Sequence, residues 1–191
     1  MKKIFIIILL LFTKVATAQE LQFMTSLKSH RLAVEHSAYV KNHTAYLYSE
    51  IGFSDAFSTY TQLFYEYNIV KHFSVHAEYR NMFFQNYGMQ NTFLVGLASP
   101  FACDYGYFSI APLYRYDSAH MWQFSAVYGF NYKFITFDGY FDLYGHSKVF
   151  AYSENKLKFH FEKLFVGVNI EYSLAYAKSI VTPYVLVGIK F

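Results

Sequence analysis

The sequence predicts an all-β protein, a transmembrane antiparallel up-and-down β-barrel of twelve strands. Three observations lead to this fold class. Apolar residues recur at every second position along most of the chain, which is the spacing of side chains on one face of a strand. Aromatic residues make up 23% of the chain and are interleaved with polar ones, as in the aromatic girdles of transmembrane barrels. The chain also ends on an aromatic residue, Phe191, which we interpret as a signal read by the barrel assembly machinery.

The first eighteen residues predict a cleaved secretory signal peptide. Lys2 and Lys3 form a basic start, and an unbroken apolar run of nine residues follows. Ala16 and Ala18 then give the small-x-small pattern that signal peptidase reads. The apolar run is too short to cross a bilayer as a helix. We therefore expect residues 1–18 to be removed and residues 19–191 to form the barrel.

Twelve strands are expected in the mature chain, an even number as in bacterial outer-membrane barrels. The clearest alternation runs from Leu164 to Leu174, with apolar residues at even positions from 164 and smaller or polar ones between them. The first two and the tenth strands have the weakest pattern, and merging or dropping them gives ten strands. The expected ranges are 21–29, 31–41, 44–53, 58–69, 72–82, 91–100, 105–116, 120–131, 133–144, 156–162, 164–174 and 180–191.

The connections between these strands are expected to differ at the two ends of the barrel. If both termini face the periplasm, the periplasmic turns are short, whereas the outer loops are longer, as is typical of such barrels. The turns are expected around Asn42, 70–71, 102–104, Tyr132 and Lys163. The longest outer loops are expected at 83–90 and 145–155.

Charge and composition exclude several other classes of protein. Removal of the signal leaves 13 basic and 13 acidic residues, because three of the 16 lysines and arginines leave with it. No basic patch of the kind that binds nucleic acid is visible. His72 and His76 have helical spacing in a predicted strand, so neither a metal site nor a cofactor is expected. A soluble β-sandwich would alternate similarly, but twelve strands of nearly equal length and the terminal Phe191 favour the barrel.

Charged residues in the predicted strands fall opposite the apolar set. On the lipid face Arg or Lys costs roughly 2–4 kcal/mol near the midplane, so these side chains must point into the lumen. Several aromatic residues share that face. The predicted lumen-lining residues are Tyr46, Tyr48, Glu50, Phe64, Glu66, His76, Glu78, Arg80, Arg115, Phe134, Asp138, Tyr140, Asp142, Lys158, His160, Glu162 and Glu171.

Two interpretations of this lumen stay open. In the first, Arg80 and Arg115 bond to Glu66, Glu78 or Asp138, and the network only pairs the polar and charged groups of the interior. In the second, the charges line a narrow selective passage. A twelve-stranded barrel lies between the filled eight-stranded and the open sixteen-stranded cases. Flat rings beside carboxylates suit a flat polar solute such as a nucleoside, whose base can stack on a ring.

Several strand segments carry a family resemblance. They read ELQFMTSL, TAYLYSEIGF, FSVHAEYRN, FITFDGYFDLYG, KLFVGVNIEYSL and the C-terminal YVLVGIKF. Over most of the mature chain the pattern resembles the Tsx-like nucleoside-channel superfamily, in particular its short members from Bacteroidetes. The resemblance implies a twelve-stranded barrel and the passage of nucleosides or similar small solutes.

The sequence thus predicts a monomeric, non-enzymatic barrel in the bacterial outer membrane. Its expected partners are outer-membrane lipid, the barrel assembly machinery and a small polar, nucleoside-like solute. The main alternative is a closed structural or ligand-capturing barrel without conductance. A lesser alternative is a phospholipase-type enzyme, in which His36 and Ser49 face the lipid on adjacent strands, although no acidic or amide residue is placed to orient His36.

Overall fold

The computed structural model describes residues 16–27, 29–53, 57–117, 120–175 and 178–191. Most of the predicted signal peptide, residues 1–15, lies outside the described residues. The strands are β1 (Ala16–Thr25), β2 (His30–Val40), β3 (His43–Phe53), β4 (Phe57–Val70), β5 (Phe73–Phe84), β6 (Gly88–Cys103), β7 (Gly106–Tyr116), β8 (Met121–Tyr132), β9 (Ile135–Gly145), β10 (Val149–Phe161), β11 (Leu164–Ala175) and β12 (Lys178–Lys190).

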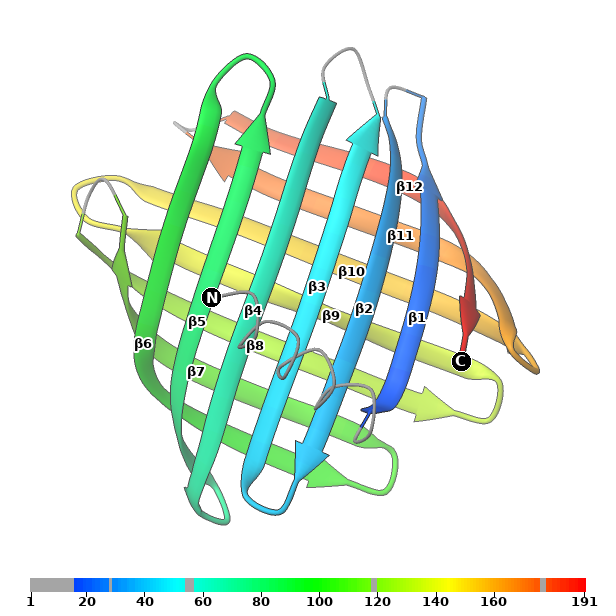
Figure 1. Ribbon diagram of the computed structural model, residues 1–191, viewed down its shortest axis with the longest axis horizontal. Helices are drawn as coiled ribbons and strands as arrows, with labels where there is room; N and C mark the ends of the chain where they lie inside the picture. The colour runs from blue at the N-terminus through cyan, green and yellow to red at the C-terminus, as the bar shows by residue number, and fades with distance from the viewer. Residues whose placement is uncertain (1–15, 28, 54–56, 118–119, 176–177) are drawn as a thin grey trace, which may run out of the picture.

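Every strand pairs antiparallel with its neighbours in the chain, and β1 pairs with β12 to close the barrel. In Figure 1, β1–β6 form the near wall and β7–β12 the far wall, and the two walls cross because the strands are tilted. The predicted twelve-stranded barrel is confirmed. Among the described residues, no helix is long and apolar enough to cross a membrane.

The closing seam joins the two ends of the described chain. Glu20 of β1 lies opposite Lys190 of β12 in the register, and the pairing continues to Thr25 opposite Val185. The backbone N–H of Phe191 donates to the carbonyl oxygen of Gln19 at 3.0 Å. Closure gives the edge strands a partner, which a sheet in hydrocarbon requires because lipid offers no hydrogen bonds.

The two faces of each strand differ as the alternation predicts. In β11, Val166 and Val168 are 43% and 44% exposed on the outer surface, whereas Phe165 and Asn169, which flank them on the other face, are fully buried. Apolar outward residues and buried inward residues are the arrangement expected when the outer surface meets lipid.

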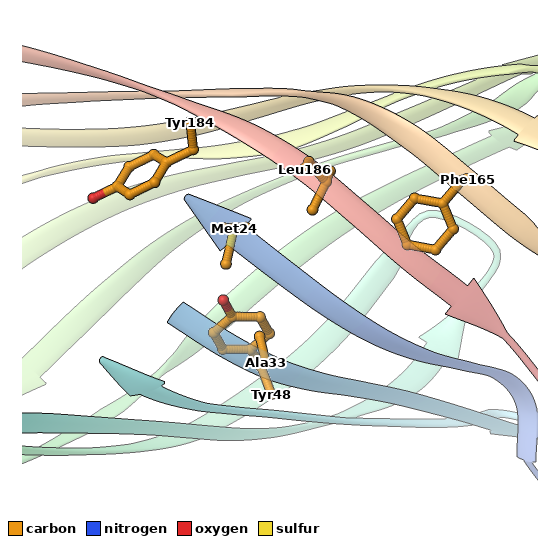
Figure 2. Close-up of a cluster of buried hydrophobic side chains, with 6 residues drawn as sticks. All are labelled: Met24, Ala33, Tyr48, Phe165, Tyr184 and Leu186. Atoms are coloured by element: carbon orange, nitrogen blue, oxygen red, sulfur yellow. The ribbon is translucent and has the colours of Figure 1, made fainter. Parts of the chain in front are cut away.

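The inner wall carries two apolar clusters. The larger one is drawn in Figure 2, where its side chains come from five strands around the closing seam. The smaller one lies on β6 and β7. Inward charged residues lie on the same strands as these clusters, as Glu50 does beside Tyr48 on β3. The larger cluster is Met24, Ala33, Tyr48, Phe165, Tyr184 and Leu186, and the smaller is Leu94, Ala98, Ala111 and Leu113.

The turns at the end of the barrel that holds Phe191, the terminus end, are as short as predicted. Five two-residue turns lie there, at 41–42, 71–72, 104–105, 133–134 and 162–163. The long loops expected at the opposite end are wrong. Only residues 85–87 separate β5 from β6, and only 146–148 separate β9 from β10.

The error at 145–155 has a physical cause. Strand β10 begins at Val149 rather than at 156, and its residues alternate normally between the two faces. Ser153 and Asn155 occupy the face opposite that of Glu154 and Lys156, so both faces are polar and the segment reads as a loop. The Asn155 amide bonds to the hydroxyl of Ser153 at 3.3 Å, and Asn155 also accepts from the hydroxyl of Tyr128. Hydrogen bonds within β10 and to β8 thus satisfy polar groups in a strand that the sequence pattern missed.

Candidate functional site: the barrel lumen

The structure places fifteen of the seventeen predicted lumen residues in strands, at inward positions of the alternation. Those on β3, β4 and β5 follow one another at every second residue. The inward set is Tyr46, Tyr48, Glu50, Phe64, Glu66, His76, Glu78, Arg80, Arg115, Asp138, Tyr140, Asp142, Lys158, His160 and Glu171.

The prediction is wrong for Phe134 and Glu162. Both lie in two-residue turns at the terminus end, where the alternation of a strand no longer applies. Phe134 is 53% exposed, and Glu162 is exposed with a positive φ of 58°. The prediction continued the alternation past the last residue of the strand, and it therefore placed both residues in the lumen incorrectly.

One ion cluster lies around Arg31 of β2, near the end of the lumen that is opposite the terminus end. Its guanidinium donates to both carboxylate oxygens of Glu171 on β11, at 2.5 and 3.0 Å. It also lies 3.3 Å from the carboxylate of Glu50 on β3. The Tyr48 hydroxyl donates to Glu50 at 2.7 Å. A single guanidinium therefore faces two carboxylates.

A second cluster crosses the lumen from β5 to β9. The Arg80 guanidinium lies 2.6 Å from Asp142 and also bonds Glu78 on its own strand. His76 lies between Glu66 and Glu78, at 2.8 and 3.2 Å from their carboxylate oxygens. The strands β6, β7 and β8 separate β5 from β9, so this bridge links distant parts of the wall.

A third cluster contains the two lysines of β10. The Lys158 ammonium lies 2.7 Å from Glu20 of β1 and 3.1 Å from Asp138 of β9. The Lys156 ammonium lies 3.1 Å from Glu154 and 3.9 Å from Glu35 of β2. Two ammonium groups here face four carboxylates.

Arg115 does not join the network as expected. It bonds Asp117 at 2.7 Å and the amide oxygen of Gln123 at 3.2 Å. The hydroxyl of Thr92 is its third partner, at 3.4 Å. Arg115 therefore reaches Asp142 of the second cluster only through Gln123 and Ser125, whose side chains are hydrogen-bonded to each other, while Arg80 bonds the expected Glu78.

Sequence reasoning missed several inward residues that complete these clusters. Glu20, Arg31 and Glu35 lie in the two weak N-terminal strands. Glu154 lies where a loop was expected, and Lys156 is the first residue of the expected strand 156–162. The alternation of the two faces could have revealed Glu154 and Lys156, because polar or aromatic residues occupy every even position from Phe150 to His160.

Three neighbouring cavities lie in the lumen, and the two larger ones share Arg80 and Asp142 as lining residues. The cavity nearest the opposite end has a volume of about 420 Å³, and the one nearest the terminus end about 360 Å³. The central cavity is the smallest, at about 120 Å³. The side chain of Tyr140 lines all three. Tyr140 therefore marks the waist at which the spaces meet.

Aromatic pairs surround this waist. The rings of Tyr140 and Tyr152 have centroids 5.7 Å apart, and those of Tyr48 and Tyr60 are 6.1 Å apart. Towards the terminus end, Tyr46 stacks on Phe64 with centroids 5.0 Å apart and an interplanar angle of 21°. Ring faces and edges in this range attract one another beyond simple burial, so the waist is built from rigid, flat side chains.

Other chemistry finds little support in the described part of the chain. No group of three or more His, Cys, Asp or Glu residues there has a geometry that could hold a metal ion. Ser49 shares a hydrogen bond of 3.3 Å with the hydroxyl of Thr61. In the β2–β3 register His36 lies opposite Leu47, whereas Ser49 lies opposite Val34. The nucleophile–base pair of the phospholipase hypothesis is therefore diagonal across β2 and β3 rather than directly opposite.

Solved structures of porins have a similar fold. A KdgM porin in complex with disordered oligogalacturonate aligns with a TM-score of 0.59 and 12% identity, over 92% of this chain and 99% of that one. A NanC porin aligns with a TM-score of 0.60 and 13% identity, over 91% and 98%. The fold is that of a porin. No family model matches the sequence, and no curated protein matches it.

The porin fold and the apolar outer surface together assign the protein to a bacterial outer membrane. At this level of identity the likeness extends to the fold. Membership of the Tsx-like superfamily, the monomeric state and the absence of enzymatic activity stay predictions.

Proposed function

We propose that the barrel is a channel for passive passage of small polar solutes, with nucleoside-like molecules as the solute class. The observation that carries the proposal is the group of three neighbouring cavities in the lumen, which share the lining residue Tyr140. The cavities at either end fall within the range of volumes that hold small-molecule ligands. The similarity in fold to proteins described as porins agrees with this function.

The nucleoside class is supported by side chains of the central cavity. The stacked rings of Tyr46 and Phe64 line it together with Gln62 and the carboxylate of Glu35. A base stacked on an aromatic side chain gains about 1–3 kcal/mol. Carboxylate and amide groups can accept hydrogen bonds from ribose hydroxyls. A flat base with a polar sugar therefore matches the chemistry of this wall.

A closed barrel without conductance is the second candidate, and the waist favours it. The central cavity holds only about 120 Å³, and Tyr48 beside it is 5% exposed. If these tyrosines do not move, they fill the lumen at its middle, and the larger cavities become separate polar pockets open to opposite ends.

Uptake into proteoliposomes distinguishes the two functions. Purified mature protein is reconstituted into phospholipid vesicles, and the entry of radiolabelled uridine is compared with that of a labelled disaccharide. The channel proposal expects uridine to enter protein-containing vesicles faster than protein-free ones, and faster than the disaccharide. Equal entry with and without protein would support the closed barrel.

Substitution at the stacked pair tests the solute class. Phe64→Leu retains an apolar side chain but removes the ring on which a base would stack, so uridine entry should saturate at a higher concentration. Phe137→Leu on the outer surface, where Phe137 is 38% exposed, is the matched control and should leave uptake unchanged. An identical response of both variants would remove the ring pair from the solute path.

A further inference from the structure

The charges that line the three cavities are unequal. Eight carboxylates face these spaces, against four lysines and arginines and one histidine. The excess of acid persists even if the histidine, His76, carries a proton. The carboxylates are those of Glu35, Glu50, Glu66, Glu78, Asp138, Asp142, Glu154 and Glu171, and the cations are those of Arg31, Arg80, Arg115 and Lys156.

Four of these carboxylates lack a lysine or arginine of their own. Glu50 shares Arg31 with Glu171 and is the more distant of the two, at 3.3 Å. The ammonium nearest to Glu35 is 3.9 Å away and lies closer to Glu154.

The remaining two lie nearer the terminus end. Asp138 shares Lys158 with Glu20, which lies closer to the ammonium. Glu66 forms an ion pair only with His76 among its described contacts. Glu50 lines the first cavity, Glu35 and Asp138 line the central one, and Glu66 lines the third. Carboxyl groups without a lysine or arginine of their own therefore occur along the whole passage.

Aromatic faces in the same lumen already hold cations. The guanidinium of Arg31 lies 4.6 Å from the ring centroid of Tyr184, and the ammonium of Lys156 lies 5.1 Å from that of Tyr48. Such contacts are attractive because the ring face is electron-rich, and they strengthen when the cation is desolvated. A mobile cation in the cavities meets the same two partners, a carboxylate and a tyrosine face.

We propose that the passage selects cations over anions, and that small organic cations with ammonium or guanidinium groups are solutes that it favours. This proposal rests on the channel function proposed above and specifies its solute charge. A narrow lumen with walls of one net sign concentrates ions of the opposite sign. The oligogalacturonate of the KdgM complex is a polyanion, so this chain would differ from that porin in the sign of the solute.

Reversal potentials in planar bilayers test the proposal. With the mature protein between unequal KCl solutions at neutral pH, K⁺ should be more permeant than Cl⁻ by roughly fivefold or more, since a unit charge at 4 Å contributes about 1 kcal/mol even in water. Replacing K⁺ by guanidinium on one side then measures the organic cation directly. Guanidinium should carry current more readily than Cl⁻.

Paired charge variants identify the residues responsible. Glu35→Gln with Glu50→Gln removes two surplus charges from the lumen and should bring the K⁺/Cl⁻ permeability ratio several-fold closer to unity. Asp104→Asn with Glu162→Gln removes two charges from exposed turns and should leave the ratio unchanged. Glu66→Gln provides a second test in another cavity if the first pair fails to assemble, which heat-modified migration on a gel reveals.

Each outcome of these recordings is decisive. Current with a preference for Cl⁻, or with none, would overturn the charge selectivity and leave the channel function standing. Equal effects of the lumen and turn variants would remove these carboxylates as its source. Currents of K⁺ without guanidinium would overturn the organic solute class, and complete silence would overturn the channel together with its selectivity.

Discussion

Replacing Arg80 by Met should destabilise the barrel by about 3 kcal/mol, roughly a 150-fold change in the unfolding equilibrium. The guanidinium lies 2.6 Å from Asp142 and also bonds Glu78, and both carboxylates are 3% exposed. Removing one partner of a buried ion pair costs about 3–5 kcal/mol because a charge is left uncompensated. The lower end applies here, since the Ser125 hydroxyl still donates to Asp142 at 2.7 Å and the amide of Gln62 to Glu78 at 2.6 Å.

Urea unfolding in phospholipid vesicles measures this change. Trp122, the single tryptophan of the chain, is 43% exposed on the outer surface, so its fluorescence reports the loss of lipid contact. Lys163→Met in an exposed turn is the control and should stay within about 0.5 kcal/mol of the parent protein. Adding Asp142→Asn to Arg80→Met should cost less than the sum of the two single changes, because the pair is coupled. A loss below about 1 kcal/mol for Arg80→Met would refute the view that cross-lumen pairs hold the walls together.

Three further predictions address the waist, the outer surface and assembly. Tyr140→Ala should raise single-channel conductance, because Tyr140 lines all three cavities; an unchanged conductance would place the constriction elsewhere. Val168→Arg, on the outward face of β11, should cost roughly 2–4 kcal/mol in the same urea assay if Val168 lies near the midplane, and a neutral effect would contradict lipid contact there. Deleting Phe191 should lower the yield of heat-modifiable barrel in outer-membrane fractions, and normal yield would remove it as an assembly signal.

The strands could be predicted where one face is apolar and the other is not. In β11 the outward Val166, Val168 and Ile170 alternate with Gly167 and Asn169, and the predicted range ends within one residue of the observed one. In β10 the alternation fails as a signal because the outward Ser153 and Asn155 are polar. The Asn155 side chain is bonded by Tyr128 from β8, a strand that is not adjacent in the chain, so local pattern alone could not reveal how Asn155 is satisfied.

The candidate site could be predicted as a set of inward residues but not as a set of contacts. The alternation of side chains along each strand places Arg80 and Asp142 on the same face as the other charged residues. It cannot show that they meet, because 62 residues separate them and their distance depends on the tilt and stagger of the closed barrel. The same holds for Arg31 and Glu171, which are 140 residues apart. At the turns, where Glu162 adopts a positive φ, the alternation ends and the inward assignment fails.

The proposed function requires a solvated passage through the closed barrel, past the tyrosines of its waist. Single-channel recording of the purified protein in planar phospholipid bilayers detects such a passage. We expect discrete current steps of uniform size that appear only after the protein is added. A correctly folded, heat-modifiable barrel that inserts into the bilayer yet carries no current at any voltage would contradict it.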